Sequence, residues 1–348
     1  MFRPLLSALA LASLVPSILV GTEAASDPVG FTRQPLTSGR QTVGVTLNHP
    51  TVLSATVAAN AADVLMLATA GRTVGERLEN GAAYYAEIAE DPAGLFTGDR
   101  FEIDVEMTQS IGGDILALRE SPHNTLPFPL GDDQLRGCRI IIRRHITLAD
   151  LFGTGSEASL TAGGDLADAD QVLLYDRARA GFDVFFLHRS PTDGTVHWRQ
   201  AGKPGNFDDT IIPTGTGMFL NRRSDSADAV LTQLGAVRTN DFVMPLSEGY
   251  NLVASPFPAA SSPADLQMNS ANGFASAATA DRADRILVFN GNDYTTYFLH
   301  RDEQSGAERW CLAGDTSRSF STAELLAAGR SVFIYKIAAD PGFIARRG

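Results

Sequence analysis

Two stretches of this chain carry the same pattern, and that pattern decides the fold. Residues 169–176 read Ala-Asp-Gln-Val-Leu-Leu-Tyr-Asp, and residues 283–290 read Ala-Asp-Arg-Ile-Leu-Val-Phe-Asn. Each run leads into an aromatic segment that ends in Leu-His-Arg and then into one of the two tryptophans of the chain, Trp198 and Trp310. The offset is 114 positions between the two runs and 112 between the tryptophans. A shared offset over so many positions predicts an internal duplication.

Each predicted copy is mostly β. The Ala-Asp run begins a continuous apolar strand, the aromatic segment forms a second strand, and a turn containing Gly194 or Gly306 returns the chain into the tryptophan strand. Short helical turns are expected where Thr147, and Ser261 or Ser262, can act as N-caps.

The residues before the first copy also indicate strands. Between residues 41 and 135, short segments alternate apolar and polar residues with period 2, and Pro, Gly and Asp separate them. This pattern predicts a small β-barrel or sandwich. The expected fold class is therefore all-β, with an N-terminal β domain followed by two tandem β repeats. The expected boundaries are 1–25 for a signal peptide, 26–40 for a flexible leader, 41–135 for the N-terminal domain, 136–240 and 241–340 for the repeats, and 341–348 for a tail.

The first 25 residues have the composition of a secretory signal. Arg3 supplies a positive charge, an apolar stretch follows, and Thr22-Glu23-Ala24 offers small residues before a cleavage site at Ala25. The apolar stretch is too short and too interrupted for a stable membrane span. We therefore expect export to the periplasm, the cell surface or the medium, with no transmembrane segment in the mature chain.

Charge and cysteine content narrow the classes further. The formal net charge is −12, which argues against nucleic-acid partners and anionic membrane surfaces. Only two cysteines are present, Cys138 and Cys311, so a small disulfide scaffold is excluded. They are either two buried thiols or one bridge formed in an oxidising compartment.

The order of motifs resembles an uncharacterised family of exported bacterial β-repeat proteins. The resemblance is carried by Thr-Leu-Ala-Asp-Leu-Phe at 147–152, the Ala-Asp run at 169–173, the Trp198-Arg199 return and the closing Gly-Met-Phe at 217–219. It covers most of the mature chain. It implies an all-β fold and an exported protein, and it implies no catalytic residues because these are packing motifs. The second copy departs from the pattern after Trp310, where Cys311 and Leu312 follow.

No catalytic motif is found. The chain has no Gly-x-Ser-x-Gly elbow, no phosphate-binding loop and no His-Glu-x-x-His helix. His188 and His197 face each other across a predicted hairpin, but Arg309 replaces the second histidine in the other copy, so no metal site is predicted. Asp-rich spots lack a calcium-loop pattern. No cofactor is expected. Trp198, Trp310, His188 and His300 are kept as candidate ligand-binding residues, although aromatic residues at equivalent strand positions more often form a core.

These observations lead to one expectation and one alternative. The expectation is an exported, non-catalytic β-repeat protein with a structural or adhesive role, whose partners are envelope components, polysaccharide or other copies of itself. The alternative is an extracellular carbohydrate-binding or carbohydrate-active protein. Exposed aromatic rings in a groove flanked by carboxylates would favour the alternative.

Overall fold

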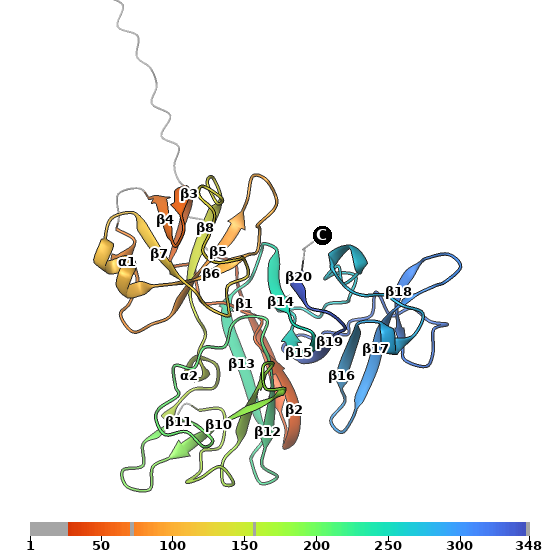
Figure 1. Cartoon of the computed structure of the whole chain (residues 1–348). Helices are drawn as coiled ribbons and strands as arrows, with labels where there is room; N and C mark the ends of the chain where they lie inside the picture. The colour runs from red at the N-terminus through yellow and green to blue at the C-terminus, as the bar shows by residue number, and fades with distance from the viewer. Residues whose placement is uncertain (1–26, 70–72, 156–157, 346–348) are drawn as a thin grey trace, which may run out of the picture.

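A computed structural model describes residues 27–69, 73–155 and 158–345, and within them the chain is mostly β, as predicted. Three parts are visible in Figure 1: a closed barrel at the upper left and two further parts below it and to its right. Each of these two parts contains a five-stranded sheet and a two-stranded ribbon, and we call them the first and second modules. The expected signal peptide lies outside the described residues.

The barrel closes in the strand order β3-β4-β7-β6-β5-β8 and has its own apolar core. Alternate residues of its strands point inward, as Ile140 and Ile142 do on β8, because side chains on a strand alternate between its two faces. Helix α1 begins after Asp104, whose side chain accepts a hydrogen bond from the Met107 amide. The elements are β3 (Leu53–Ala61), β4 (Val64–Ala68), η1 (Gly75–Arg77), β5 (Tyr84–Glu90), β6 (Arg100–Ile103), α1 (Val105–Ile111), β7 (Ile115–Arg119) and β8 (Arg139–Arg144).

The sheet of the first module has the strand order β11-β10-β9-β12-β2, all antiparallel. The predicted hairpin joins β10 to β11 and places Leu187 opposite Trp198. Helix α2 is capped by a capping box between Thr147 and Asp150. The elements are β2 (Gly39–Gly44), α2 (Leu148–Phe152), β9 (Gln171–Asp176), β10 (Gly181–Arg189), β11 (Val196–Gln200) and β12 (Gly217–Arg222).

The sheet of the second module has the corresponding order β18-β17-β16-β19-β15. Its hairpin places Leu299 opposite Trp310, in the same register as the first module. Ser262 and Asp265 exchange the same capping hydrogen bonds as Thr147 and Asp150. The elements are β15 (Gly249–Ala254), η3 (Ser270–Asn272), η4 (Ala280–Arg282), β16 (Arg285–Phe289), β17 (Tyr294–Arg301), β18 (Glu308–Leu312) and β19 (Ser331–Lys336).

A two-stranded ribbon accompanies each sheet. In the first module β1 (Val29–Leu36) pairs with β13 (Ala229–Ala236), and in the second β14 (Phe242–Leu246) pairs with β20 (Asp340–Ala345). In each module, the first ribbon strand directly precedes the sheet strands in the chain, and the second ribbon strand directly follows them. The expected tail at 341–348 therefore lies partly in a strand, because β20 continues the pairing as far as Ala345.

The barrel is inserted into the first module instead of preceding it. Strand β2 comes before the barrel in the chain but pairs with β12, which comes after it, and β8 closes the barrel directly before α2. In the second module the same connection takes only residues 255–261. The expected boundaries at 41 and 136 are corrected accordingly, because β2 is a module strand and β8 is a barrel strand. Local sequence patterns do not reveal which strands pair when the two strands lie so far apart in the chain.

The expected flexible leader, residues 26–40, is also corrected, because it contains β1 and the start of β2. Its polar residues misled the sequence interpretation, since β1 buries Thr32 and Gln34 and exposes Val29 and Phe31. The polar side chains have partners at the free edge of β2: Gln34 Nε2 donates to the Thr42 carbonyl and Gln233 Nε2 to the Gly44 carbonyl, both at 2.8 Å. Amide side chains here satisfy carbonyls that a neighbouring strand would otherwise pair.

Candidate functional site

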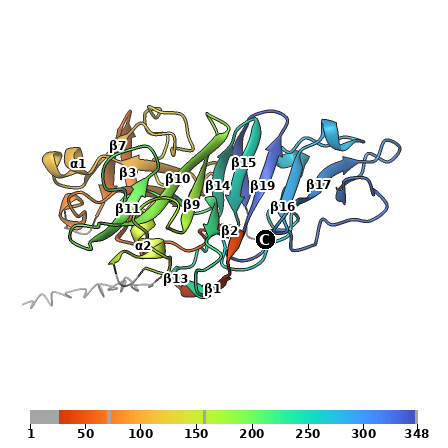
Figure 2. The ribbon, with the colours of Figure 1, turned by 90° about the horizontal axis from the view of Figure 1, so that it is seen from below.

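The two sheets meet along an aromatic seam, formed by Tyr175, Phe182 and Phe219 of the first module and Phe289, Tyr294 and Phe333 of the second. Figure 2 shows the sheets side by side, with β2, β14, β15 and β19 between β9 and β16. The contacts across the seam are reciprocal. Phe219 meets Phe289 edge-on with ring centroids 5.4 Å apart, and Tyr175 meets Phe333 edge-on at the same 5.4 Å. Such edge-to-face pairs stabilise packing beyond the area they bury.

Backbone hydrogen bonds across the junction follow the same reciprocal pattern. The Gly44 amide donates to the Gly329 carbonyl, and the Ala254 amide donates to the Gly215 carbonyl, each at 2.8 Å. Gly44 and Ala254 end corresponding strands, and Gly215 and Gly329 precede corresponding strands. The modules are therefore related by an approximate two-fold axis, as in an isologous dimer interface.

The seam is only partly covered. Phe182 is 38% exposed, Tyr294 37% and Tyr250 44%. The Tyr250 ring lies 5.6 Å from that of Phe333 and so extends the seam within the second module. Half-exposed rings held by neighbouring rings provide flat apolar surface with a polar hydroxyl at the edge.

Two cavities flank the seam at related positions. The first, of about 210 Å³, is lined by Tyr175 and Arg177 of the first module and by Asn251 of the second, and the barrel contributes Arg100 and His123. The second, of about 380 Å³, is lined by Phe289 and Arg330 of the second module and by Arg40 and Gln41 of the first. An amide side chain of the opposite module meets an arginine in each: Arg177 Nη1 lies 3.4 Å from Asn251 Oδ1, and Arg330 Nη1 lies 3.5 Å from Gln41 Oε1.

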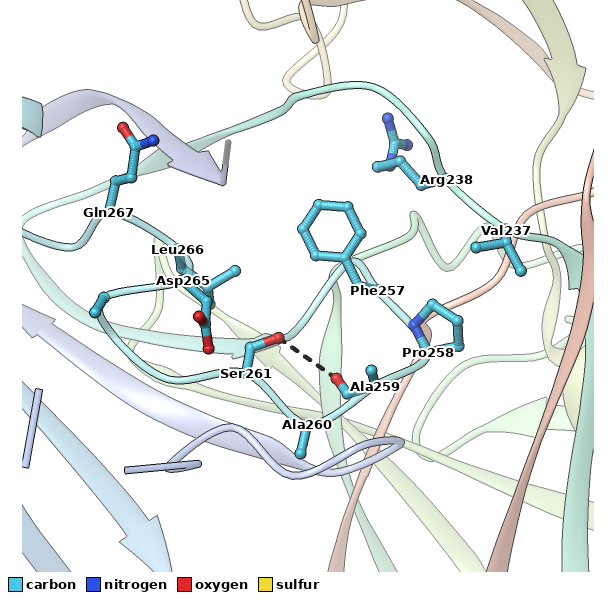
Figure 3. A pocket seen from close by; sticks show the side chains of 11 residues that line it. Val237, Arg238, Phe257, Pro258, Ala259, Ala260, Ser261, Asp265, Leu266 and Gln267 are labelled. Atoms are coloured by element: carbon cyan, nitrogen blue, oxygen red, sulfur yellow. Dashed lines mark hydrogen bonds between the residues drawn. The ribbon is translucent and has the colours of Figure 1, made fainter. Parts of the chain in front are cut away.

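A third, more apolar cavity of about 460 Å³ lies beside the loop at 257–267 (Figure 3). Phe257 projects into it, and the polar side chains on the loop are bonded within the protein, whereas Nε and Nη2 of Arg238 have no partner among the described residues. Ser261 Oγ donates to the Ala259 carbonyl at 3.4 Å, and Asp265 accepts from Ser262 Oγ at 2.7 Å. This cavity suits an apolar ligand better than a chemical reaction.

Buried charges join the barrel to the second module. Two guanidinium groups lie over the Phe242 ring, that of Arg100 at 5.1 Å and that of Arg238 at 4.7 Å from its centroid. Arg238 also pairs with the buried Glu87, and this attraction, together with other hydrogen bonds, outweighs burial and lowers the pKa of Glu87. This arrangement holds the ribbon strand β14 against the barrel.

The candidate tryptophans are structural residues in separate cores. Trp198 is fully buried in the first module and Trp310 is 2% exposed in the second. Each indole Nε1 donates to a backbone carbonyl, Gly153 for Trp198 at 3.1 Å and Met268 for Trp310 at 2.7 Å. Neither ring reaches the seam surface, so a ligand-binding role that requires an exposed indole does not fit them.

The candidate histidines occupy matching positions on β10 and β17, and the structure does not bring them together. His188 and His300 are buried, and Nδ1 of each has no hydrogen-bond partner among the described residues. The His197 ring lies 5.5 Å from His188, whereas Arg309 stands opposite His300. Burial, with the Arg199 charge, lowers the pKa of His188, which keeps it neutral near pH 7.

The repeated Ala-Asp motif has a structural explanation. Asp170 and Asp284 are fully buried and pair with Arg222 and Lys336 at the ends of β12 and β19. Each carboxylate also accepts from two backbone amides, those of Thr161 and Arg223 in the first module and of Ala275 and Ile337 in the second. The motif joins each central strand to its neighbouring loops.

Sequence reasoning did not identify Arg100, His123 and Arg177, which the fold brings to one cavity from the barrel and the first module. No sequence motif marks these residues, because they lie far apart in the chain and meet only in the folded structure.

Among the described residues, no group of three or more His, Cys, Asp or Glu side chains is placed to hold a metal ion. In the same part of the chain no helix is long and apolar enough to cross a membrane. Comparison of the sequence and structure with protein-family models, curated proteins and solved structures finds no match in any of the three.

Proposed function

We propose that this protein is exported and has a non-catalytic, structural or adhesive role in the envelope or outside the cell, and that its two modules arose by duplication. The observation that carries the proposal is the reciprocal seam, in which Phe219–Phe289 and Tyr175–Phe333 contacts join two corresponding sheets into one unit. The charged pairs of the motifs are buried and bonded within each module. They therefore support packing instead of chemistry on a substrate.

Export is tested by fractionating cells that produce the full chain and by sequencing the N-terminus of the recovered protein. The expected result is a mature chain that begins at Ala25 in the exported fraction. A full-length chain confined to the cytoplasm would overturn the proposal.

Carbohydrate binding is the second candidate, and one observation favours it: the half-exposed rings of Phe182, Tyr250 and Tyr294 along the seam. Sugars stack on such rings through their apolar faces. The test is a glycan array and a polysaccharide pull-down with the mature protein and with a Phe182→Ala/Tyr294→Ala variant. The matched control is Phe31→Ala, which removes an exposed ring on the β1–β13 ribbon.

Three outcomes separate the two functions. Binding that the double variant loses and Phe31→Ala keeps supports the carbohydrate function. No retention on any glycan favours the purely structural role. Release of soluble sugar products would contradict the non-catalytic assignment.

A further inference from the structure

We propose that the cavity between the barrel and the two modules is a binding site for an oxyanion, the carboxylate or sulfate group of a small acidic molecule or acidic sugar. Its lining combines Arg100 and His123 of the barrel, Tyr175 and Arg177 of the first module and Asn251 of the second. This inference does not depend on the structural or adhesive role.

The first support is the state of Arg100. The residue is only 6% exposed, its Nε has no hydrogen-bond partner, and its side chain donates no hydrogen bond to any described residue. Its guanidinium group lies over the Phe242 ring, which fixes its plane but satisfies none of its donors. A buried guanidinium without acceptors is costly, and a bound oxyanion supplies acceptors in the geometry that arginine prefers.

The second support is the charge of the lining. None of the fifteen described residues that form this cavity is Asp or Glu, although the chain as a whole has a net charge of −12. Burial lowers the pKa of Arg100 and that of Arg177, because desolvation penalises their charged forms. At Arg100 the Arg238 charge adds to this effect, and the charges of Glu87 and Glu102, which lie behind the cavity lining, oppose it only in part. A bound anion would relieve this penalty.

The third support is Arg177 itself. Its Nη1 donates to the Pro245 carbonyl at 2.8 Å and lies 3.4 Å from Asn251 Oδ1, which positions the guanidinium group at the cavity wall. No hydrogen bond of its Nε or Nη2 to another described residue is observed. The arginines thus come from two separate parts of the fold and share one space.

The related cavity on the other side of the seam supplies an internal comparison. It has Arg40 and Arg330 and no carboxylate in its lining, but the barrel does not reach it. The inserted barrel therefore adds Arg100 and His123 to one of two similar cavities. Burial is the largest cause that lowers the pKa of His123 to about 4, so the ring is neutral near pH 7 and serves as a hydrogen-bonding group.

The size of the site limits the ligand. At about 210 Å³ the cavity is below the usual 300–1,000 Å³ of drug-sized pockets, so it holds an anionic group with at most a small ring attached. Tyr175 belongs to both the cavity and the seam, so a sugar ring attached to the anion would lie on the seam rings.

The test is calorimetric titration of the mature protein with sulfate, D-glucuronate and uncharged D-glucose at constant ionic strength. We expect sulfate or D-glucuronate to bind and D-glucose not to bind. Binding of sulfate alone identifies a free inorganic oxyanion, and binding of D-glucuronate identifies an acidic sugar. Binding of neither anion overturns the proposal.

Substitutions locate the site. Arg177→Gln should weaken anion binding about tenfold or more, because it removes a charged donor, whereas Arg177→Lys should retain part of the affinity. The matched control is Arg179→Gln on the same turn, whose exposed side chain pairs with Asp176 and Asp183 outside the cavity. Circular dichroism melting shows whether each variant is folded. Unchanged binding by a folded Arg177→Gln variant, or an equal loss in Arg179→Gln, would overturn the proposal.

Discussion

Gly217 of β12 lies directly against Ser331 of β19, its counterpart 114 positions later in the chain. A Cβ atom at Gly217 would lie 2.4 Å from Ser331 Cβ and 2.9 Å from its Oγ. Gly44 and Ala254 show the same relationship, with a distance of 2.3 Å between the added Cβ and that of Ala254. Corresponding residues of the two modules are in contact at the approximate two-fold axis. In both of these contacts one of the two residues is glycine. The two modules therefore differ at the positions where identical side chains would collide.

This relationship predicts a coupled pair of substitutions. Gly217→Ala should destabilise the protein by about 1–3 kcal/mol through overpacking. Adding Ser331→Gly should recover part of that loss, because it removes two of the three closest contacts and leaves only the Val253 amide at 3.0 Å. Urea unfolding of the two single variants and the double variant measures the coupling. Strictly additive losses would contradict direct packing of these residues.

Asp170 predicts a large and pH-dependent loss of stability. Burial would raise its pKa, but hydrogen bonds from the Thr161 and Arg223 amides, Ser226 and Arg222 outweigh burial and lower the pKa below its usual value. Asp170→Asn should cost about 3–5 kcal/mol at pH 7, because it leaves the buried Arg222 uncompensated. The exposed Asp225→Asn, which only breaks the surface pair with Arg223, should cost much less, because solvent screens that pair.

The sign of the pH effect follows from linkage. A depressed folded pKa gives stability that is present above the unfolded pKa of about 3.9 and is lost as the pH falls through the folded value. The difference in unfolding free energy between wild type and Asp170→Asn should therefore shrink below about pH 4. A difference that stays constant down to pH 2 would show that folding does not lower the pKa of Asp170.

Asp99 should show the opposite pH dependence. Burial raises its pKa to about 6, despite the hydrogen bond from Thr125 and the charge of Arg100. A raised folded pKa means that the cost of the ionised, buried carboxylate grows between about pH 4 and pH 6 and persists above it. Asp99→Asn keeps an acceptor for Thr125 Oγ1, which lies 2.6 Å from Asp99 Oδ1. It should stabilise the protein by roughly 2–3 kcal/mol at pH 8 and have little effect at pH 4.

Thermal unfolding between pH 4 and pH 8 measures this gain. Asp132→Asn, at an exposed carboxylate, is the matched control and should change stability by less than about 0.5 kcal/mol. A loss of stability in Asp99→Asn at pH 8 would show that the charge is needed in the fold.

Local patterns predicted the elements of the fold but not its connections. The hairpins at Trp198 and Trp310 could be predicted because a glycine turn lies between alternating strands, and the two registers agree. The insertion of the barrel could not be predicted, since it depends on β2 pairing with β12. Strand β1 was missed because Gln34 and Gln233 face inward to the carbonyls of β2. The arginine cavity was missed for the same reason as the insertion: Arg100 and Arg177 meet only through tertiary structure.

Both cysteines should remain thiols in the folded protein. Cys138 lies in the barrel core, and Cys311 packs with Phe298 in a small apolar cluster of the second module. Both thiols are free and buried. Burial, with the nearby Asp91 charge, raises the pKa of Cys138 to about 11, so very little of this thiol is ionised at pH 8. Iodoacetamide should label neither residue rapidly in the native protein and both in 6 M guanidinium chloride, as mass spectrometry can measure. A mass two units lower without added reductant would instead indicate a disulfide.

The inserted barrel should fold without the modules. Its six strands close on themselves, its apolar core is separate, and its two ends meet because Leu53 of β3 pairs with Ile142 of β8. When the barrel is excised, water solvates Glu87 and Arg143 in place of their partners Arg238 and Asp27.

A fragment of residues 49–146 should therefore give a dispersed NMR amide spectrum and one cooperative melting transition. Phe101→Ala in this fragment is the control, because loss of a buried ring should cost about 3–5 kcal/mol and lower or abolish the transition. A fragment that melts without cooperativity would show that the barrel requires β14 and its Phe242 contact to fold.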